Sequence, residues 1–107
     1  MSTTALLFQF SYAGPWGAEL SANAVELAKD IAGETGLISK IWIENQHQGK
    51  AGGLYFFTDE EAADRYRVKH EARLEAMGVH DVDVAVYSVN EPLSRLTGIQ
   101  VSGACPG

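Results

Sequence analysis

The sequence has 107 residues, of which 46% are hydrophobic and 21% charged, a balance typical of one ordinary globular domain. The net charge is -6, and no run of Lys or Arg offers the concentrated basic surface that a nucleic-acid backbone requires. No apolar stretch is long enough to span a bilayer, and the amino terminus does not have the pattern of a secretion signal. We therefore expect one cytoplasmic domain over residues 1–107, with no nucleic-acid or membrane partner.

The first half of the chain predicts a strand, a helix and a second strand. Residues from Thr3 to Tyr12 alternate between two faces, and Gly14-Pro-Trp-Gly17 ends this strand. Apolar residues then recur at three- and four-residue spacing from Leu20 to Ile31, which indicates an amphipathic helix ending near Gly33. Residues 37–45 alternate again. One expected face of this strand carries Leu37, Ile41 and Ile43, and the other carries Ile38, Lys40, Trp42 and Glu44.

The second half predicts two further strands around a second helix. The polar segment 46–53 is expected to form a hairpin-like loop before a strand over residues 54–58. Thr58-Asp-Glu-Glu61 has the pattern of a capping box, so we expect a helix from Thr58 to about Met77, before Gly78. A last strand from Val82 to Asn90 should end at Glu91-Pro92, because proline has no amide donor for the ladder.

Residues from about 95 to 107 are expected to be a closing segment and a flexible tail. This tail holds Cys105, the only cysteine of the sequence, so no internal disulfide can form. A nucleophilic role for Cys105 would need a fixed base beside it, and the sequence gives no sign of one.

The order of elements predicts an α+β fold, a ferredoxin-like βαββαβ sandwich with one antiparallel sheet under two helices. Two helices cover only one face of a four-stranded sheet, yet large apolar residues fall on both faces. We therefore expect a homodimer joined through the sheet face that carries Lys40, Trp42 and Glu44, with Lys40 and Glu44 in an interstrand or intersubunit ion pair. The alternative is a monomer whose C-terminal segment folds back over the sheet.

Polar residues on the second helix offer the main chemical signal. Tyr66, His70 and Arg73 lie on or beside its apolar stripe, opposite Asp64 and Glu71. Buried polar groups need partners. Either His70 donates to a strand carbonyl while the other two reach the rim, or His70 is the base of a pocket between helix and sheet.

The two tryptophans are open to a similar choice. Trp42 either packs or touches a ligand, and Trp16 is either a pocket lid or a hydrophobic staple. The glycine motifs of nucleotide sites and the clustered ligands of metal sites are missing from the sequence, in which His47, His70 and His80 lie far apart. We therefore expect no cofactor and no metal.

Five segments together resemble the YdhR-type monooxygenases, over residues from about Leu6 to Ser94. They are Gly14-Pro-Trp-Gly17, Gly36-Leu-Ile-Ser-Lys-Ile-Trp-Ile-Glu44, Ala51-Gly-Gly-Leu-Tyr-Phe-Phe-Thr-Asp59, Lys69-His-Glu-Ala-Arg-Leu74 and Val89-Asn-Glu-Pro-Leu-Ser94. The resemblance implies a dimeric α/β barrel, an architecture shared with cofactor-independent oxygenases, quinol oxygenases and some haem-degrading enzymes. It also implies an aromatic substrate between sheet and helices.

The leading functional hypothesis is a monooxygenase that oxidises a small aromatic or quinol-like compound with O₂, without metal or flavin. The residues assigned to it are His70 as the base, Arg73 as the oxyanion partner, and Trp16, Trp42, Tyr55 and Tyr66 around the substrate. One alternative is a non-catalytic, ligand-binding or stress-associated barrel. Another is a haem-binding barrel with His70 as axial ligand.

Overall fold

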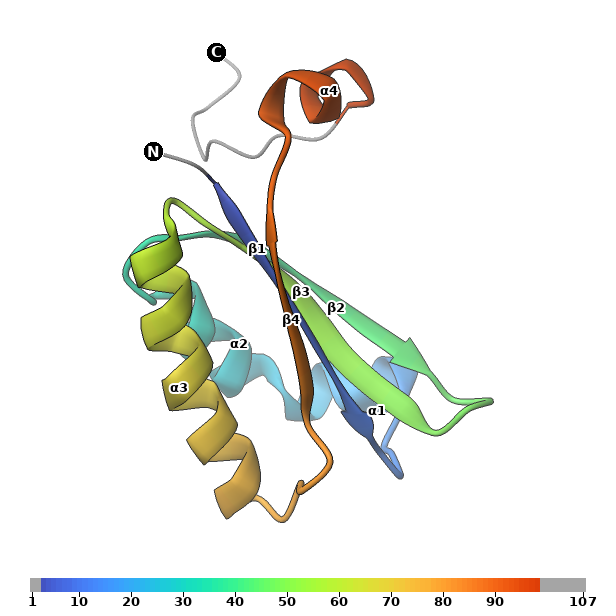
Figure 1. Cartoon of the computed structure of the whole chain (residues 1–107). Helices are drawn as coiled ribbons and strands as arrows, with labels where there is room; N and C mark the ends of the chain where they lie inside the picture. The colour runs from blue at the N-terminus through green and yellow to red at the C-terminus, as the bar shows by residue number, and fades with distance from the viewer. Residues whose placement is uncertain (1–2, 99–107) are drawn as a thin grey trace.

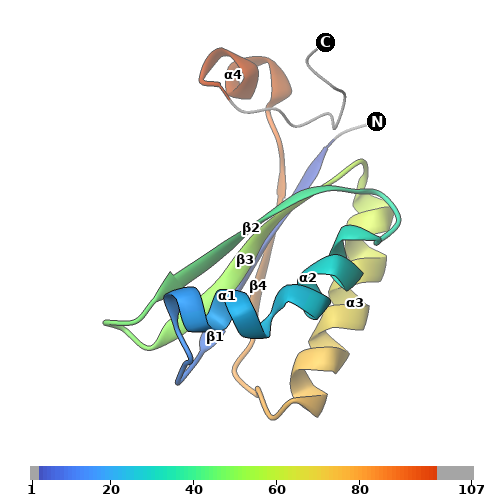
Figure 2. The same ribbon diagram turned by 180° about the vertical axis from the view of Figure 1, so that it is seen from behind.

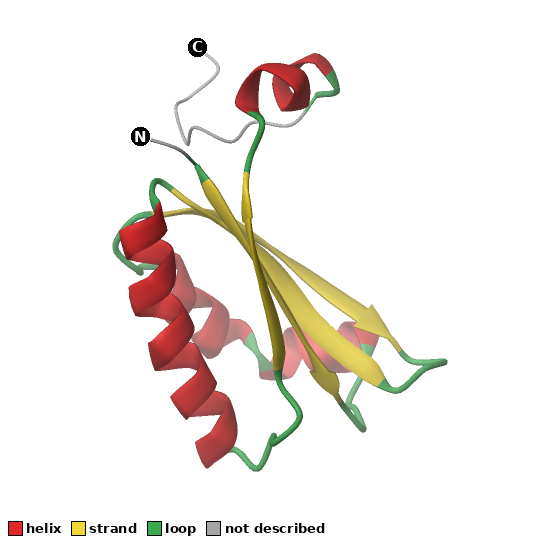
Figure 3. Ribbon diagram, in the orientation of Figure 1, coloured by secondary structure: helices red, strands yellow, loops and turns green. Residues whose placement is uncertain are grey.

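Four strands and four helices make up residues 3–98, the part of the chain that the computed structural model describes (Figure 1, Figure 3). The elements are β1 (Thr4–Ser11), α1 (Gly17–Asn23), α2 (Val25–Ala32), β2 (Leu37–Asn45), β3 (Lys50–Phe57), α3 (Glu60–Ala76), β4 (Asp83–Ser88) and α4 (Glu91–Leu96). The longest of them, α3, has 17 residues. Within the described range no helix has both the length and the apolar character needed to cross a lipid bilayer.

The strands form one sheet in the order β2-β3-β1-β4, in which every neighbouring pair is antiparallel. Helices α1, α2 and α3 all lie against the same face of this sheet, as the front and back views show (Figure 1, Figure 2). The predicted α+β, ferredoxin-like class is therefore confirmed. The short helix α4 stands beyond the end of β4, away from the helix layer (Figure 1).

The core fills the space between the sheet and these helices. Phe8 of β1, Tyr55 and Phe57 of β3, Ile31 of α2 and Tyr66 of α3 are all buried in one cluster. Their aromatic rings meet mostly edge to face or tilted, as for Phe8 and Tyr55 with centroids 5.4 Å apart. The period-2 pattern of β1 and β3 thus supplies one half of the core, and the helical stripes supply the other half.

Three boundaries differ from those that the sequence predicts. The first predicted helix is two helices, α1 and α2, which meet at Ala24. The third strand begins at Lys50 rather than at residue 54, because Gly52 and Gly53 extend the ladder without side chains that would hint at a strand. The residue that caps α3 is Asp59 rather than Thr58, and its carboxylate accepts a hydrogen bond of 2.8 Å from the backbone N–H of Ala62.

A bulge in β2 overturns the predicted assignment of faces. Leu37 is paired with Phe57 and Ser39 with Phe56, so Ile38 is an extra residue and the alternation shifts by one position. Leu37 packs against the core under the helices, whereas Ile38 packs on the opposite side against Ala5 and Phe56. Every later residue of β2 therefore lies on the face opposite to the one that strict alternation from Leu37 predicts.

The sheet face that carries Lys40, Trp42 and Glu44 is consequently the face under the helices. Lys40 is paired with Tyr55, which belongs to the helix-side core, and Trp42 and Glu44 follow at two-residue spacing. The prediction that this face joins two subunits is wrong, because α1, α2 and α3 already occupy it. None of the helices α1, α2 and α3 lies against the opposite face, which we call the free face (Figure 1, Figure 2). At one end of this face Val89 packs on Ala5 and Phe56.

One apolar row crosses the free face from edge to edge. Ile41 pairs with Leu54, Leu54 with Leu7, and Leu7 with Ala85, so the row spans all strands of the sheet. Ile41 is 47% exposed and Tyr87 of the adjacent row is 56% exposed. The described part of the C-terminal segment forms α4 and does not cover this row (Figure 1). The predicted tail and Cys105 lie outside the described residues.

Candidate active site

A cavity of about 340 Å³ lies between the sheet and the helix layer, next to the aromatic core. Its walls come from β1, the turn after β1, the helices α1, α2 and α3, and the strands β2 and β3. Most lining side chains are apolar, and they include Phe10, Leu20, Leu27, Leu74 and Val79. Such a concave apolar space with a few polar groups is the usual form of a small-molecule site.

Three of the predicted site residues, Trp42, Tyr55 and His70, line this cavity. Trp42 also lines a more open groove of about 490 Å³ between β2 and the helices α1 and α2. Leu20, Ala24 and Glu44 also line both spaces.

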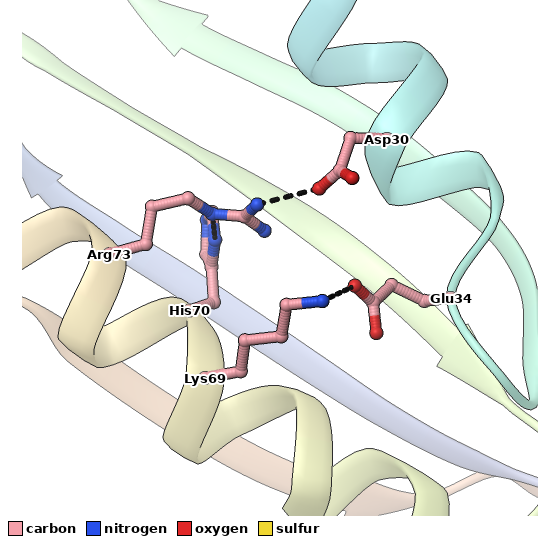
Figure 4. Close-up of polar contacts among 5 residues, drawn as sticks. All are labelled: Asp30, Glu34, Lys69, His70 and Arg73. Atoms are coloured by element: carbon pink, nitrogen blue, oxygen red, sulfur yellow. Dashed lines mark hydrogen bonds and ion pairs between the residues drawn. The ribbon is translucent and has the colours of Figure 1, made fainter.

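The other three predicted residues do not line the cavity. Tyr66 is buried behind it, with its ring stacked on His70 at 5.0 Å between centroids. Trp16 packs edge to face on Tyr12, a lining residue, with centroids 5.0 Å apart, so it supports the wall from outside. Arg73 lies on the far side of His70, where its guanidinium turns toward α2 (Figure 4).

Arg73 joins α3 to α2 and at the same time fixes the imidazole of His70. Its Nη1 donates to the carboxylate of Asp30 at 2.8 Å, and its Nε donates to Nδ1 of His70 at 3.1 Å (Figure 4). Lys69 and Glu34 form a second ion pair alongside (Figure 4). The Nη2 of Arg73 and the hydroxyl of Tyr66 are buried, and neither has a hydrogen-bond partner of good geometry among residues 3–98.

His70 is a neutral hydrogen-bond donor in this arrangement. Burial, and then the positive charges of Arg73 and Lys40, lower the pKa of His70 to about 3. Its Nδ1 accepts from an arginine that never gives up its protons, so the proton of the neutral ring is on Nε2. Because His70 lines the cavity, this Nε2–H is the hydrogen-bonding group that it can offer to a ligand.

Lys40 also lines the cavity, although the sequence predicts it in a subunit interface. Its Nζ lies 3.4 Å from the ring centroid of Trp42 and 4.6 Å from that of Tyr55. Burial, and then the charge of Arg73, lower the pKa of Lys40 to about 7. Within residues 3–98 neither Lys40 nor Glu44 forms an ion pair, and the Glu44 carboxylate accepts a hydrogen bond of 2.8 Å from the backbone N–H of Gly17.

A signal for Lys40 does exist in the sequence. It is a single basic residue in the apolar strand Leu37-Ile-Ser-Lys-Ile-Trp-Ile. A charged residue there must face either water or a binding site that supplies it with a partner. Only the position of the bulge decides between the two, and bulges leave no clear mark in a sequence of β-branched residues.

No group of three or more His, Cys, Asp or Glu side chains within residues 3–98 is placed to hold a metal ion. His47 and His80 are exposed, and they are far in sequence from buried His70. The polar side chains that line the cavity are those of Tyr12, Asn23, Lys40, Glu44, Tyr55 and His70.

A family model described as "Putative mono-oxygenase ydhR" matches residues 5–99. The chain belongs to this family. The resemblance that five sequence segments indicate is thus confirmed over nearly the whole chain. No curated protein sequence shows significant similarity to this ydhR-family chain.

Two solved structures share the fold of this ydhR-family protein. One is a mutant of SnoaB, a cofactor-independent oxygenase from Streptomyces nogalater, with a TM-score of 0.60 and 14% identity over 84% of this chain and 95% of that chain. The other is NE2512, a protein of unknown function from Nitrosomonas europaea, with a TM-score of 0.58 and 16% identity over 84% and 91% of the two chains. At these identities the likeness is one of fold.

Proposed function

We propose that this ydhR-family protein is a monooxygenase that oxidises a small aromatic or quinol-like compound with O₂ and needs no metal or flavin. The observation that carries the proposal is the apolar cavity of about 340 Å³, with aromatic walls and few polar groups, between sheet and helices. The family description and the likeness in fold to SnoaB, itself a cofactor-independent oxygenase, support the same reaction class.

The reaction begins with removal of a proton from the substrate. The resulting anion is electron-rich, so it can transfer one electron to O₂, and the radical pair can then combine to a peroxide. Loss of water leaves one oxygen atom as a new carbonyl group on the substrate. The substrate supplies all the electrons, and the dry cavity keeps the intermediates from water.

His70 and Arg73 keep their place in this proposal, but their contacts favour particular roles. That His70 is the base stays a prediction. The hydrogen bond from Arg73 occupies Nδ1, which favours His70 as a donor to the substrate oxygen, held in place by Arg73. Arg73 lies on the other side of the imidazole from the cavity, and its positive charge lowers the energy of a substrate anion bound there.

The contacts of His70 do not suit an axial haem ligand. An imidazole that binds iron through Nε2 carries its proton on Nδ1 and donates it to an acceptor. Here Nδ1 faces the donor Nε of Arg73, so the opposite tautomer is fixed. A non-catalytic barrel that only binds its ligand is the remaining alternative, and it would use the same cavity.

Oxygen consumption tests the proposal directly. Chelator-treated protein is mixed with anthrone-like compounds and aromatic quinols, in air and under nitrogen, while O₂ uptake and product are followed. We expect product only in air, with one O₂ consumed per product and no need for added flavin, nicotinamide or metal. Activity that disappears on chelation or requires an added cofactor would exclude this mechanism, and binding without any O₂ uptake would favour the non-catalytic barrel.

A further inference from the structure

We infer that Lys40 is the group that takes a proton from an acidic hydroxyl of the ligand, so that the cavity selects phenols and enols and holds them as anions. The inference deepens the proposed function by naming the base and the ligand class. It depends on the proposed function only for the reaction with O₂ that follows binding.

The strand positions Lys40 as a cavity residue. The bulge at Ile38 turns it under the helices, where it lines the cavity beside Trp42 and Tyr55. Gly53 of β3 leaves room for its stem, since a Cβ at Gly53 would lie 2.6 Å from Cε of Lys40. The amine is thus held against two aromatic faces by the backbone pattern of a strand pair.

No carboxylate within residues 3–98 forms an ion pair with Lys40. Glu44 is on the same strand and lines the same cavity, but its carboxylate is bound to the amide of Gly17. Asp30 of α2 is paired with Arg73. A buried amine without a counter-ion is costly when charged, and a ligand that supplies the negative charge removes this cost.

The remaining titratable groups around the cavity do not compete with Lys40 for this role. Burial raises the pKa of Tyr55 and of Tyr12, so both phenols keep their protons at neutral pH. His70 and Arg73 approach from α3, one neutral and one a permanent cation. With a pKa of about 7, Lys40 is the side chain here that has a free lone pair in a large share of molecules at neutral pH.

Proton transfer from the ligand to Lys40 creates a pair of opposite charges in the cavity. The O–H bond of the ligand breaks, a new N–H bond forms on Lys40, and an ammonium–phenolate or ammonium–enolate pair results. The Nε2–H of His70 can donate to the same oxygen, and Arg73 adds a second positive charge nearby. In a site with little water such charge-assisted contacts are stronger than in solution.

The test uses 7-hydroxycoumarin, a small phenol whose anion absorbs at longer wavelength than its neutral form. It is titrated with the full-length protein under nitrogen, at a pH where the free probe is mostly neutral. We expect the bound probe to show the anion band with the wild type. Lys40→Met should reduce the affinity for the anion by on the order of tenfold to a hundredfold, the usual effect of losing a charged hydrogen-bond partner.

Controls separate this effect from misfolding and from surface charge. Lys40→Gln must behave like Lys40→Met, and circular dichroism must show both variants folded. Lys29→Met, which removes an exposed lysine of α2, must leave the anion band unchanged. A wild type that binds only the neutral probe, fails to bind it, or binds carboxylates such as benzoate in its place would overturn the inference.

The outcomes also separate this inference from the proposed function. An anion band that depends on Lys40, without O₂ uptake by any quinol or anthrone-like compound, leaves the inference standing and removes the oxygenase. If Lys40→Met oxygenates the substrate as fast as the wild type does, the oxygenase stands and Lys40 is not its base.

Discussion

Burial acts on His70 and Lys40 in the same direction but gives them different chemistry. Both side chains lose water, and loss of water disfavours the charged form of each. His70 starts from a lower pKa, so it is neutral throughout the physiological range, and its one acceptor nitrogen is already bonded to Arg73. Lys40 starts from a much higher pKa, so the same effect brings its titration to about pH 7.

This difference predicts the pH dependence of turnover. If Lys40 is the base, activity requires its unprotonated form, which is lost as the pH falls through about 7. We expect kcat/KM for a weakly acidic quinol to rise about tenfold per pH unit below pH 7 and to level off above it. Initial rates of O₂ uptake between pH 5 and pH 9 measure this profile.

Variants at the two positions assign the profile to a residue. His70→Ala should lower kcat/KM by about tenfold or more through loss of the donor, yet keep the rise toward pH 7. Lys40→Met should lower it by on the order of a hundredfold and abolish that rise. A rate that is flat from pH 5 upward would instead match a base with the pKa of about 3 found for His70, and would return the catalytic role to the imidazole.

Among the elements, β2 illustrates which parts of the fold the sequence can predict. Its bounds, Leu37–Asn45, agree with those expected, because alternation and the flanking turn residues are local signals. The face of every residue after Ile38 differs from the prediction, since one extra residue at Ile38 reverses the pattern. Whether a strand contains such a residue depends on its partner β3, which lies farther along the chain.

Helix α3 shows the same limit at the site. The arc of Tyr66 and His70 was correctly predicted to face the core, because a period of 3.6 fixes one side of a helix. The sequence did not show that His70 lines the cavity whereas Tyr66 lies behind it. That distinction depends on how the sheet and the helix layer pack together, which no local pattern in the sequence records.

The β2–β3 pair therefore allows a test that removes no polar group but shifts the position of one. In Gly53→Ala, the new Cβ would lie 2.6 Å from Cε of Lys40 and 2.9 Å from Cε1 of Tyr55, so the lysine stem must move. We expect the anion band of bound 7-hydroxycoumarin to weaken by about tenfold or more, with a loss of about 1–3 kcal/mol in unfolding free energy from overpacking.

Gly33→Ala is the matched control for this variant. A Cβ at Gly33 would meet only the backbone oxygen of Asp30, at an ordinary 3.5 Å, so neither binding nor stability should fall. Absorbance titration and urea unfolding measure the two quantities. If Gly53→Ala binds the probe as an anion as well as the wild type does, the position of the Lys40 stem is unimportant for the site.

At the scale of the whole molecule, the two faces of the sheet are unequally covered. The helices shield one face, whereas the row of Ile41, Leu54, Leu7 and Ala85 runs uncovered across the other. Helix α4 projects past the sheet and carries Leu93 and Leu96, which are 61% and 82% exposed (Figure 1). Contiguous exposed apolar surface is typical of interaction sites in soluble proteins.

We propose that two copies pack through their free faces around a twofold axis, which retains the expected homodimer but uses the opposite side of the sheet. An isologous contact places the same row on both sides, so a single substitution in it acts twice. Ile41→Glu would bring two carboxylates into the apolar contact, where burying them unpaired costs several kcal/mol. We therefore expect light scattering at micromolar concentration to give about twice the chain mass for the wild type and the chain mass for Ile41→Glu.

Val68→Glu separates this effect from a general effect of added charge. Val68 is 56% exposed on α3, on the helix side of the molecule, so its replacement should leave the dimer intact. Circular dichroism must show both variants folded. Because the cavity lies on the other side of the sheet from Ile41, a monomeric Ile41→Glu variant should still bind 7-hydroxycoumarin. A wild type that is monomeric, or an Ile41→Glu variant that stays dimeric while Val68→Glu dissociates, would exclude the free face as the interface.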